Sequence, residues 1–92
     1  MIYEVKFTNQ FKRELKRAEK QGKDIEELFS VIQKIANDEK LDAKYHDHAL
    51  KGNYKRCREC HIESGWLLIY ELIDDVCVLM LNRLGSHTEL SD

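Results

Sequence analysis

All four histidines of the chain lie at or beyond its midpoint, at His46, His48, His61 and His87. Histidine can both accept and donate a proton near neutral pH, so several histidines together suit acid–base catalysis. Arg83 lies in the second half and could stabilise an anion such as a phosphate. A single histidine near a strand end is most often structural or exposed. The case for chemistry therefore depends on the histidines converging in the fold.

A second pattern, Cys-Arg-Glu-Cys-His at residues 57–61, matches c-type haem attachment. We reject this interpretation because haem attachment belongs to exported proteins and the sequence shows no export signal. If the segment is a strand, Cys57 and Cys60 also point to opposite faces. We interpret Cys60 and Cys77 as small core residues.

The sequence does not predict a zinc site, because no second Cys/His pair at ligand spacing completes one. His46 and His48 would share a face if extended, which leaves room for a fortuitous metal site. A metal or haem protein therefore stays a third hypothesis, which an absorption spectrum and a metal analysis would test.

The composition is that of an ordinary globular domain, with 42% hydrophobic and 35% charged residues. A length of 92 residues predicts one domain over residues 1–92. The longest apolar run, residues 66–70, is far too short to span a membrane. We expect no export signal and a cytoplasmic location, and three cysteines, an odd number, fit a reducing compartment.

The net charge of −2 is not typical of a nucleic-acid-binding protein, but the cations are clustered. Residues 11–23 contain six Lys/Arg and two Glu, and taken alone this patch is best explained as a solvated helix face. The second patch, which contains no acid, consists of Lys51, Lys55, Arg56 and Arg58. Phosphate affinity depends on where such cations lie.

Hydrophobic periodicity predicts one strand and two helices in the first half. Residues 2–7 alternate as in a half-buried strand. A helix follows from residue 11, with Thr8 or Asn9 as its cap and Gly22 as its stop. Asp24 begins a second amphipathic helix, which extends to Ala36 and is antiparallel to the first across a short turn.

Three strands are predicted in the second half, at residues 54–62, 66–73 and 76–83, with hairpin-length connections. The middle strand has no polar face at residues 66–70, so it should be central and covered on both sides. The two helices cover one face, and a C-terminal segment or a partner must cover part of the other. The predicted architecture is an α+β two-layer domain in the order β-α-α-β-β-β.

Four segments resemble conserved segments of YafQ-type toxins of the RelE-like microbial ribonuclease fold. They occur in family order and with family-like spacing. They are Tyr45–Gly52, Arg58–Ile62, Trp66–Tyr70 and Arg83–Leu90. With the strand–helix–helix opening, the resemblance covers essentially the whole chain.

The resemblance implies an endoribonuclease that cleaves mRNA in the ribosome without a metal or other cofactor. The RNA 2′-hydroxyl would attack the adjacent phosphate, which requires a base, an acid and a cation. His48 and His87 are the candidate proton-transfer pair, His61 is a third group, and Arg83 would stabilise the phosphate. We expect these imidazoles and the Arg83 guanidinium to converge on one solvent-reachable patch of the sheet.

The resemblance also implies residues that bind RNA and a protein partner. Trp66 would stack a base, unless it is a core aromatic, and Lys51, Lys55 and Arg56 would hold the RNA backbone. The partner would be a short, partly disordered antitoxin of the DinJ or RelB kind that folds on binding. No membrane partner is expected.

Two positions depart from the family pattern. Gly65 stands where the family often carries Asp, and Ser91 stands where many members carry an aromatic residue. Glu63 could substitute for the missing acid, and His46 falls at a variable position. These departures and the net negative charge of the chain motivate an alternative, in which a catalytically weak toxin-fold module acts mainly by antitoxin binding and operon autorepression. Growth arrest on expression of the chain alone would exclude that alternative.

Overall fold

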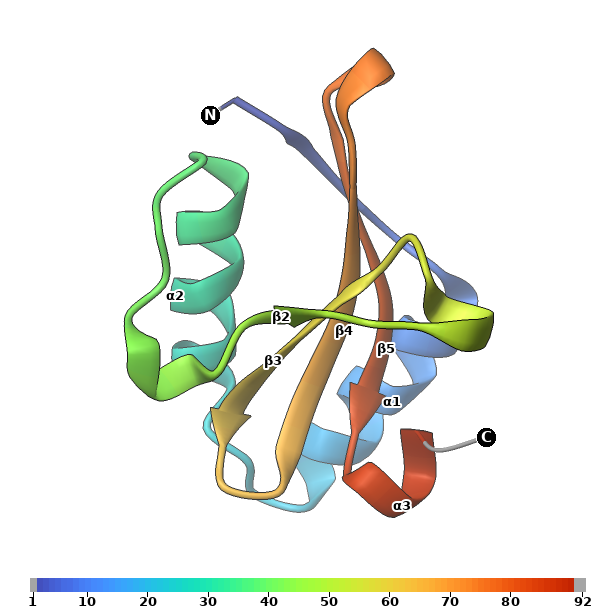
Figure 1. Cartoon of the computed structure of the whole chain (residues 1–92). Helices are drawn as coiled ribbons and strands as arrows, with labels where there is room; N and C mark the ends of the chain where they lie inside the picture. Colours follow the sequence, from blue (N-terminus) through green and yellow to red (C-terminus); the bar gives the residue numbers. More distant parts are fainter. Residues whose placement is uncertain (1, 91–92) are drawn as a thin grey trace.

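The structure, a computed structural model, describes residues 2–90 and contains one five-stranded sheet in the order β1-β5-β4-β3-β2 (Figure 1). The strands are β1 (Glu4–Phe7), β2 (His48–Ala49), β3 (Arg58–Glu63), β4 (Trp66–Ile73) and β5 (Val78–Gly85). β1 is parallel to β5, and the other neighbouring pairs are antiparallel. The predicted α+β architecture with a mostly antiparallel sheet is confirmed.

Two long helices follow β1, and both begin at capping residues. The Thr8 hydroxyl accepts a hydrogen bond from the Phe11 N–H at the start of α1 (Asn9–Lys20). An Asp24 carboxylate oxygen does the same for the Glu27 N–H at the start of α2 (Ile25–Ala36). These bonds satisfy N–H groups that have no partner within the helix.

The helices bury their apolar stripes against one face of the sheet. This first core cluster includes Phe11 and Ala18 of α1, Leu28 and Ile32 of α2, and Leu68 of β4. Burial of these side chains supplies most of the stabilisation of the two-layer arrangement.

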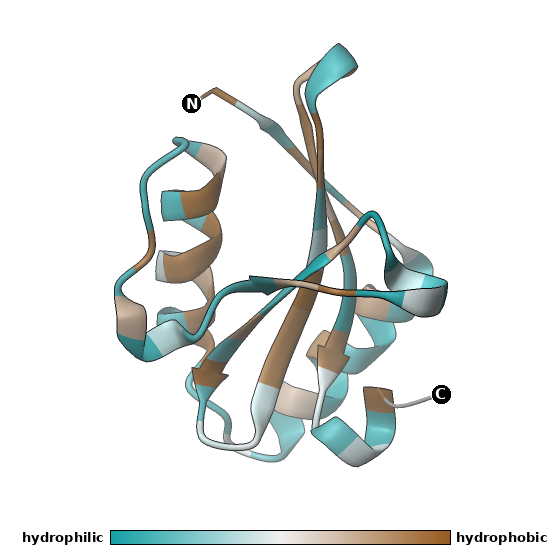
Figure 2. Ribbon diagram, in the orientation of Figure 1, coloured by the Kyte–Doolittle hydropathy of each residue, from teal (hydrophilic) through white to brown (hydrophobic). Residues whose placement is uncertain are grey.

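A second, smaller cluster lies on the opposite face. Leu67 and Ile69 of β4 contact Cys57 and also Leu90, which ends a short C-terminal helix, α3 (His87–Leu90). β4 is therefore covered on both faces, and Figure 2 shows much of its length as hydrophobic. The expectation that a C-terminal segment covers part of the second face is confirmed.

The connections contain elements that periodicity did not predict. Three short 3₁₀ helices lie in them: η1 (Ala43–Tyr45), η2 (Gly52–Tyr54) and η3 (Asp74–Val76). The strand predicted from residue 54 begins only at Arg58, because the Cys57 N–H donates to the Tyr54 carbonyl at 2.8 Å and closes a turn. β2 was also missed, because two residues are too few for a periodic signal.

The two cysteines interpreted as core residues have different environments. Cys60 is fully buried in the first cluster, as expected. The interpretation of Cys77 is wrong: it is exposed at the end of η3, with a positive φ of 51° that turns the chain into β5. Within residues 2–90 no helix is long and apolar enough to cross a membrane.

Candidate active site

The sheet face opposite the two long helices carries the candidate site, and β3 contributes its centre. Glu59 pairs with Ile69 and His61 pairs with Leu67, so all four side chains point to the face of the second cluster. His48 of β2 pairs with Glu59 and lies on the same face. The alternation of a strand thus places acidic and imidazole groups side by side.

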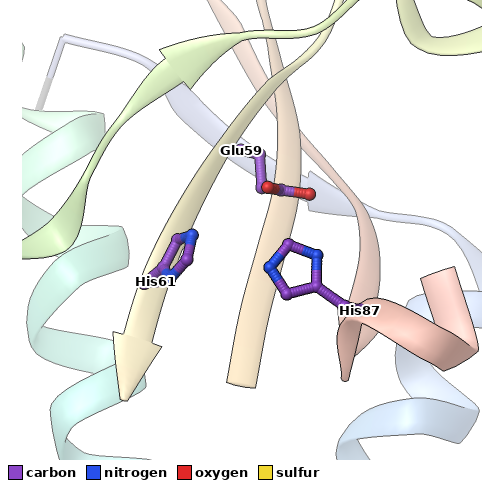
Figure 3. A group of neighbouring side chains, drawn as sticks. All are labelled: Glu59, His61 and His87. Carbon is purple, nitrogen blue, oxygen red and sulfur yellow. The ribbon is translucent and has the colours of Figure 1, made fainter. Parts of the chain in front are cut away.

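The four histidines converge around His61. Its ring centroid lies 5.3 Å from that of His46, 6.5 Å from that of His48 and 5.6 Å from that of His87. Figure 3 shows Glu59 and His61 on β3 and His87 at the start of α3, with their side chains directed toward one another. The structure brings the three predicted imidazoles together and adds His46, which sequence reasoning ranked below them. We call His46, His48, His61 and His87 the histidine cluster.

Glu59 is a member of the site that sequence reasoning missed. Its carboxylate is almost fully buried and lies 3.4 Å from Nε2 of His48. Nδ1 of His48 lies 2.7 Å from the His46 carbonyl oxygen. Both nitrogens of His48 therefore face acceptors, which fixes the orientation of its ring. Strand alternation could have identified Glu59 from the sequence, because residues 59 and 61 lie on the same face of any strand.

The pKa of His61 is lowered from its usual value. Burial is the largest cause, because it disfavours the charged ring, and the neighbouring imidazoles of His46, His87 and His48 act in the same direction. The Glu59 carboxylate opposes the shift. His61 is thus set to be neutral near pH 7, with one nitrogen able to accept a proton.

Arg83 lies on the same sheet face, but Glu14 holds it. Its Nε lies 3.1 Å from both Glu14 carboxylate oxygens, Nη2 lies 2.8 Å from one of them, and Nη1 donates to the Tyr54 hydroxyl at 3.1 Å. The pKa of Arg83 is raised, mainly by the hydrogen bonds to Glu14. Most of the guanidinium donors are engaged by these partners, so Arg83 shares the sheet face of the imidazoles while Glu14 and Tyr54 hold it.

A bulge in β5 explains this geometry. The pairing with β4 shifts between Arg83 and Leu81, so Asn82 is an extra residue in the strand. β1 ends at Phe7, opposite Leu81, and leaves the next part of the β5 edge without a strand neighbour. The side chain of Glu14 in α1 takes that place, and its carboxylate accepts a hydrogen bond from the Leu84 N–H at 2.9 Å.

An ion pair supports the segment that carries the first two histidines. Asp47, between them, contacts the Arg58 guanidinium at 3.1 Å and accepts a hydrogen bond from the Tyr70 hydroxyl at 2.7 Å. The pKa of Arg58 is raised, with the hydrogen bond to Asp47 as the largest cause. This network fixes residues 46–48 against β3 and β4.

The residues expected to bind RNA are not placed with the histidine cluster. Trp66 is only 2% exposed and packs in the first core cluster, so the core interpretation is correct and base stacking is contradicted. Lys55 and Arg56 are exposed and line a separate hollow with Glu71 and Asn82. Lys51 is exposed where it caps η2.

The positions that depart from the family pattern have local explanations. The Glu63 carboxylate accepts the Asp24 N–H at 3.1 Å, beside the start of α2, so the expectation that it replaces the missing acid is wrong. Gly65 has a φ of 75° in the β3–β4 turn, a conformation that favours glycine. Ser91 lies outside the described residues.

The histidine cluster also contains a set of potential metal ligands. Glu59, His61 and His87 each offer one ligand atom, and these atoms lie within 4.8 Å of one another. Imidazole nitrogens and a carboxylate suit late first-row divalent ions. These ligands come from β3 and α3 and not from a local motif, so the sequence pattern alone did not predict them. The case against haem stands, since Cys57 and Cys60 belong to clusters on opposite faces.

Comparison with known proteins extends these observations over nearly the whole chain. Residues 3–92 match the family described as "Bacterial toxin of type II toxin-antitoxin system, YafQ". The chain is 34% identical over 88 residues to the mRNA interferase toxin YafQ of Escherichia coli strain K12, covering 95% of this chain and 94% of that protein.

Solved structures agree with the fold. A copper-bound mutant toxin from Helicobacter pylori is 37% identical, with a TM-score of 0.91, and covers 99% of this chain and 100% of that one. A chain of the E. coli DinJ–YafQ toxin–antitoxin complex is 32% identical, with a TM-score of 0.88, and covers 100% of both chains.

Proposed function

Because this chain belongs to the YafQ family of type II toxin–antitoxin toxins, we propose that it is the toxin of such a pair and an endoribonuclease that cleaves mRNA. The observation that carries the proposal is the histidine cluster around Glu59 on the second face of the sheet. Such a group can supply both a proton acceptor and a proton donor, which RNA cleavage by its own 2′-hydroxyl requires.

In the proposed reaction the 2′-oxygen bonds to the adjacent phosphorus and the bond from phosphorus to the 5′-oxygen breaks. The 2′-hydroxyl proton goes to a base, and the departing 5′-oxygen receives a proton from an acid. The products are a 2′,3′-cyclic phosphate and a 5′-hydroxyl. The protein must hold the two groups on opposite sides of the phosphate.

Geometry suggests the roles. His48, whose Nδ1 is held by the His46 carbonyl, would act as the proton donor by turning its Nε2 proton from the Glu59 carboxylate, 3.4 Å away, to the 5′-oxygen. His61, whose ring lies 6.5 Å away, suits the acceptor, and its lowered pKa agrees with that role. His87, whose ring lies 5.6 Å from that of His61, would contact the phosphate. Glu59 orients the imidazoles, and Arg83, held by Glu14 and Tyr54, stabilises the strand that leads to His87.

The cognate partner in this proposal is an antitoxin protein of the DinJ kind, since DinJ forms a complex with the similar YafQ. The substrate would be mRNA bound in the ribosome, and the site of action the cytoplasm. Lys51, Lys55 and Arg56 would contact the RNA backbone or the ribosome outside the histidine cluster.

The test is cleavage of a defined mRNA by the purified chain in a translating extract. We expect 5′-hydroxyl ends and cyclic phosphate ends, and loss of both with His61→Ala. Asp75→Asn, at the exposed tip of the β4–β5 hairpin, is the matched control and should cut normally. Cleavage by His61→Ala at the normal rate would contradict the site, and absence of growth arrest when the wild-type chain is expressed alone would favour the catalytically weak module instead.

Transition-metal binding is a second candidate, favoured by Glu59, His61 and His87 and by the copper-bound relative. A bound ion would occupy the nitrogen lone pair that proton transfer by His61 needs, so metal binding and RNA cleavage would exclude each other. Titration of the purified chain with Zn²⁺ or Cu²⁺, followed by calorimetry, tests this. Binding that His87→Ala does not weaken would contradict it.

A further inference from the structure

The C-terminal helix α3, which carries His87, is too short to be stable by itself. It has four residues, His87–Leu90, and follows β5 through Ser86. Isolated helices shorter than about 12 residues are marginal in water, so contacts with the rest of the fold must fix α3. Those contacts also determine where the His87 ring lies.

Ser86 and Glu89 cap α3 reciprocally. The Glu89 N–H donates to the Ser86 hydroxyl at 3.2 Å, and the Ser86 N–H donates to Oε1 of Glu89 at 2.8 Å. These bonds form a capping box, in which a Ser and a Glu three residues later satisfy N–H groups at the start of a helix. His87 is the first residue inside the box, and its ring is directed toward His61 (Figure 3).

Two further contacts join the capping box to the rest of the fold. Oε2 of Glu89 lies 3.2 Å from Nη2 of Arg17 in α1, and Leu90 is buried in the second core cluster. Both side chains of the ion pair are partly exposed, so water screens their attraction. We therefore expect the capping bonds to restrain α3 more than the ion pair does.

The end of β5 leaves space for the Glu89 carboxylate because residue 85 is a glycine. A Cβ added at Gly85 would lie 2.8 Å from Oε1 of Glu89, closer than side-chain carbons approach other atoms in folded proteins. A larger residue there would displace the carboxylate that accepts the Ser86 N–H. Glycine at this position therefore preserves the cap.

We infer that Glu89 is a positioning residue for RNA cleavage, because the cap that it forms holds the His87 ring beside His61. The inference rests on the proposed function, in which His87 contacts the phosphate. The two ring centroids lie 5.6 Å apart, and a misplacement of about 1 Å in a reacting group can cost roughly 100-fold in rate. Glu89 acts on the reaction through His87, so its effect on cleavage should vanish when His87 is absent.

The experiment is a double-mutant cycle on the rate of cleavage of a defined mRNA in a translating extract. We expect Glu89→Ala to cut roughly 100-fold more slowly than the wild type. In the His87→Ala background the same substitution should change the remaining rate by less than about twofold, because no ring is left to misplace. Glu26→Ala removes an exposed carboxylate from the first turn of α2 and is the matched control, which should cut normally.

Two more variants separate the cap from the ion pair with Arg17. Glu89→Gln loses the ion pair but keeps an oxygen that can accept the Ser86 N–H, so it should cut within about threefold of the wild type. Gly85→Ala keeps Glu89 but crowds its carboxylate, so it should slow cleavage as Glu89→Ala does. Slow cleavage by Glu89→Gln together with normal cleavage by Gly85→Ala would overturn the role of the cap.

NMR contacts between the ring protons of His61 and His87 test the positioning without RNA. We expect these contacts in the wild type and in Glu89→Gln, and their loss in Glu89→Ala. Normal cleavage by Glu89→Ala, or equal effects of this substitution with and without His87, would overturn the inference alone. Absence of cleavage by the wild type, with ring contacts that depend on Glu89, would contradict the proposed function and still support the positioning of His87.

Discussion

Two groups of ionisable side chains lie on the same sheet and have opposite characters. In the histidine cluster three rings are exposed, and they contact one another and one carboxylate. In the pair of Glu14 and Arg83 the carboxylate is only 4% exposed, and both of its oxygens accept hydrogen bonds. The first group can exchange protons with a ligand, whereas the second is satisfied internally and stabilises the fold.

The comparison shows why residue type alone does not identify a site. Arg83 and His61 both fall in segments that resemble the toxin family, and both have chemistry suited to RNA cleavage. Their surroundings separate them, because Glu14 and Tyr54 engage the donors of Arg83. Substitutions in the histidine cluster should therefore lower cleavage, whereas substitutions of internally packed or paired residues should lower stability.

The largest effect is expected for His61→Ala. Removal of a proton-transfer group should lower the cleavage rate by roughly 100- to 10,000-fold. Because the ring lies on the sheet face and not in the core, the melting temperature should change little. Single-turnover cleavage and thermal unfolding of the same sample measure both. A large loss of stability would instead show that His61, like Glu14 and Arg83, mainly stabilises the fold.

Glu14→Ala should show the opposite pattern, with a large effect on stability. It leaves the partly buried Arg83 charge and the Leu84 N–H without their acceptor, which should lower the free energy of unfolding by about 3–5 kcal/mol. Glu19→Ala, exposed on the same helix, is the control and should change it by about 0.5 kcal/mol or less. Denaturant titration measures the difference, and equal effects of the two substitutions would refute a structural role for the pair.

Trp66→Phe should affect stability more than cleavage. Since the indole packs in the first core cluster, the smaller ring should leave a cavity and cost about 1–3 kcal/mol. The cleavage rate of the folded variant should stay within about threefold of the wild type, because ΔΔG‡ from a residue outside the site is small. A strong loss of cleavage at full stability would restore the base-stacking role.

The smallest expected effect is the pH dependence of the contribution of His61 to stability. The pKa of His61 is lowered below its usual value of 6.5, so its ring should stay neutral to a lower pH than in an unfolded chain. Below pH 6.5 the unfolded state then binds this proton more readily, and the contribution of His61 to stability falls as pH falls. An NMR titration of the His61 ring measures the midpoint. A midpoint above 6.5 would show that Glu59 outweighs burial and the neighbouring imidazoles.

The sequence predicts the elements whose signals are local. Thr8 and Asp24 cap their helices as expected, and β4 is the central strand that its apolar residues indicate. The convergence of His48, His61 and His87 followed from the resemblance and from strand alternation.

Features that depend on distant pairing were missed. Glu14 reaches Arg83 only because β1 ends early and β5 contains a bulge, and neither feature has a local pattern. The ligand set of Glu59, His61 and His87 requires α3 to return beside β3. Cys77 appears apolar by residue type, yet the turn after η3 exposes it.

The most direct test of the histidine cluster uses an mRNA in which sulfur replaces the 5′-oxygen at the cleavage point. A thiolate departs without receiving a proton, so this substrate no longer needs the acid but still needs the base. We expect His48→Ala to cut the sulfur substrate at nearly the wild-type rate, while His61→Ala remains inactive on it. Equal failure of both variants on the sulfur substrate would contradict the assignment of His48 as proton donor and His61 as proton acceptor.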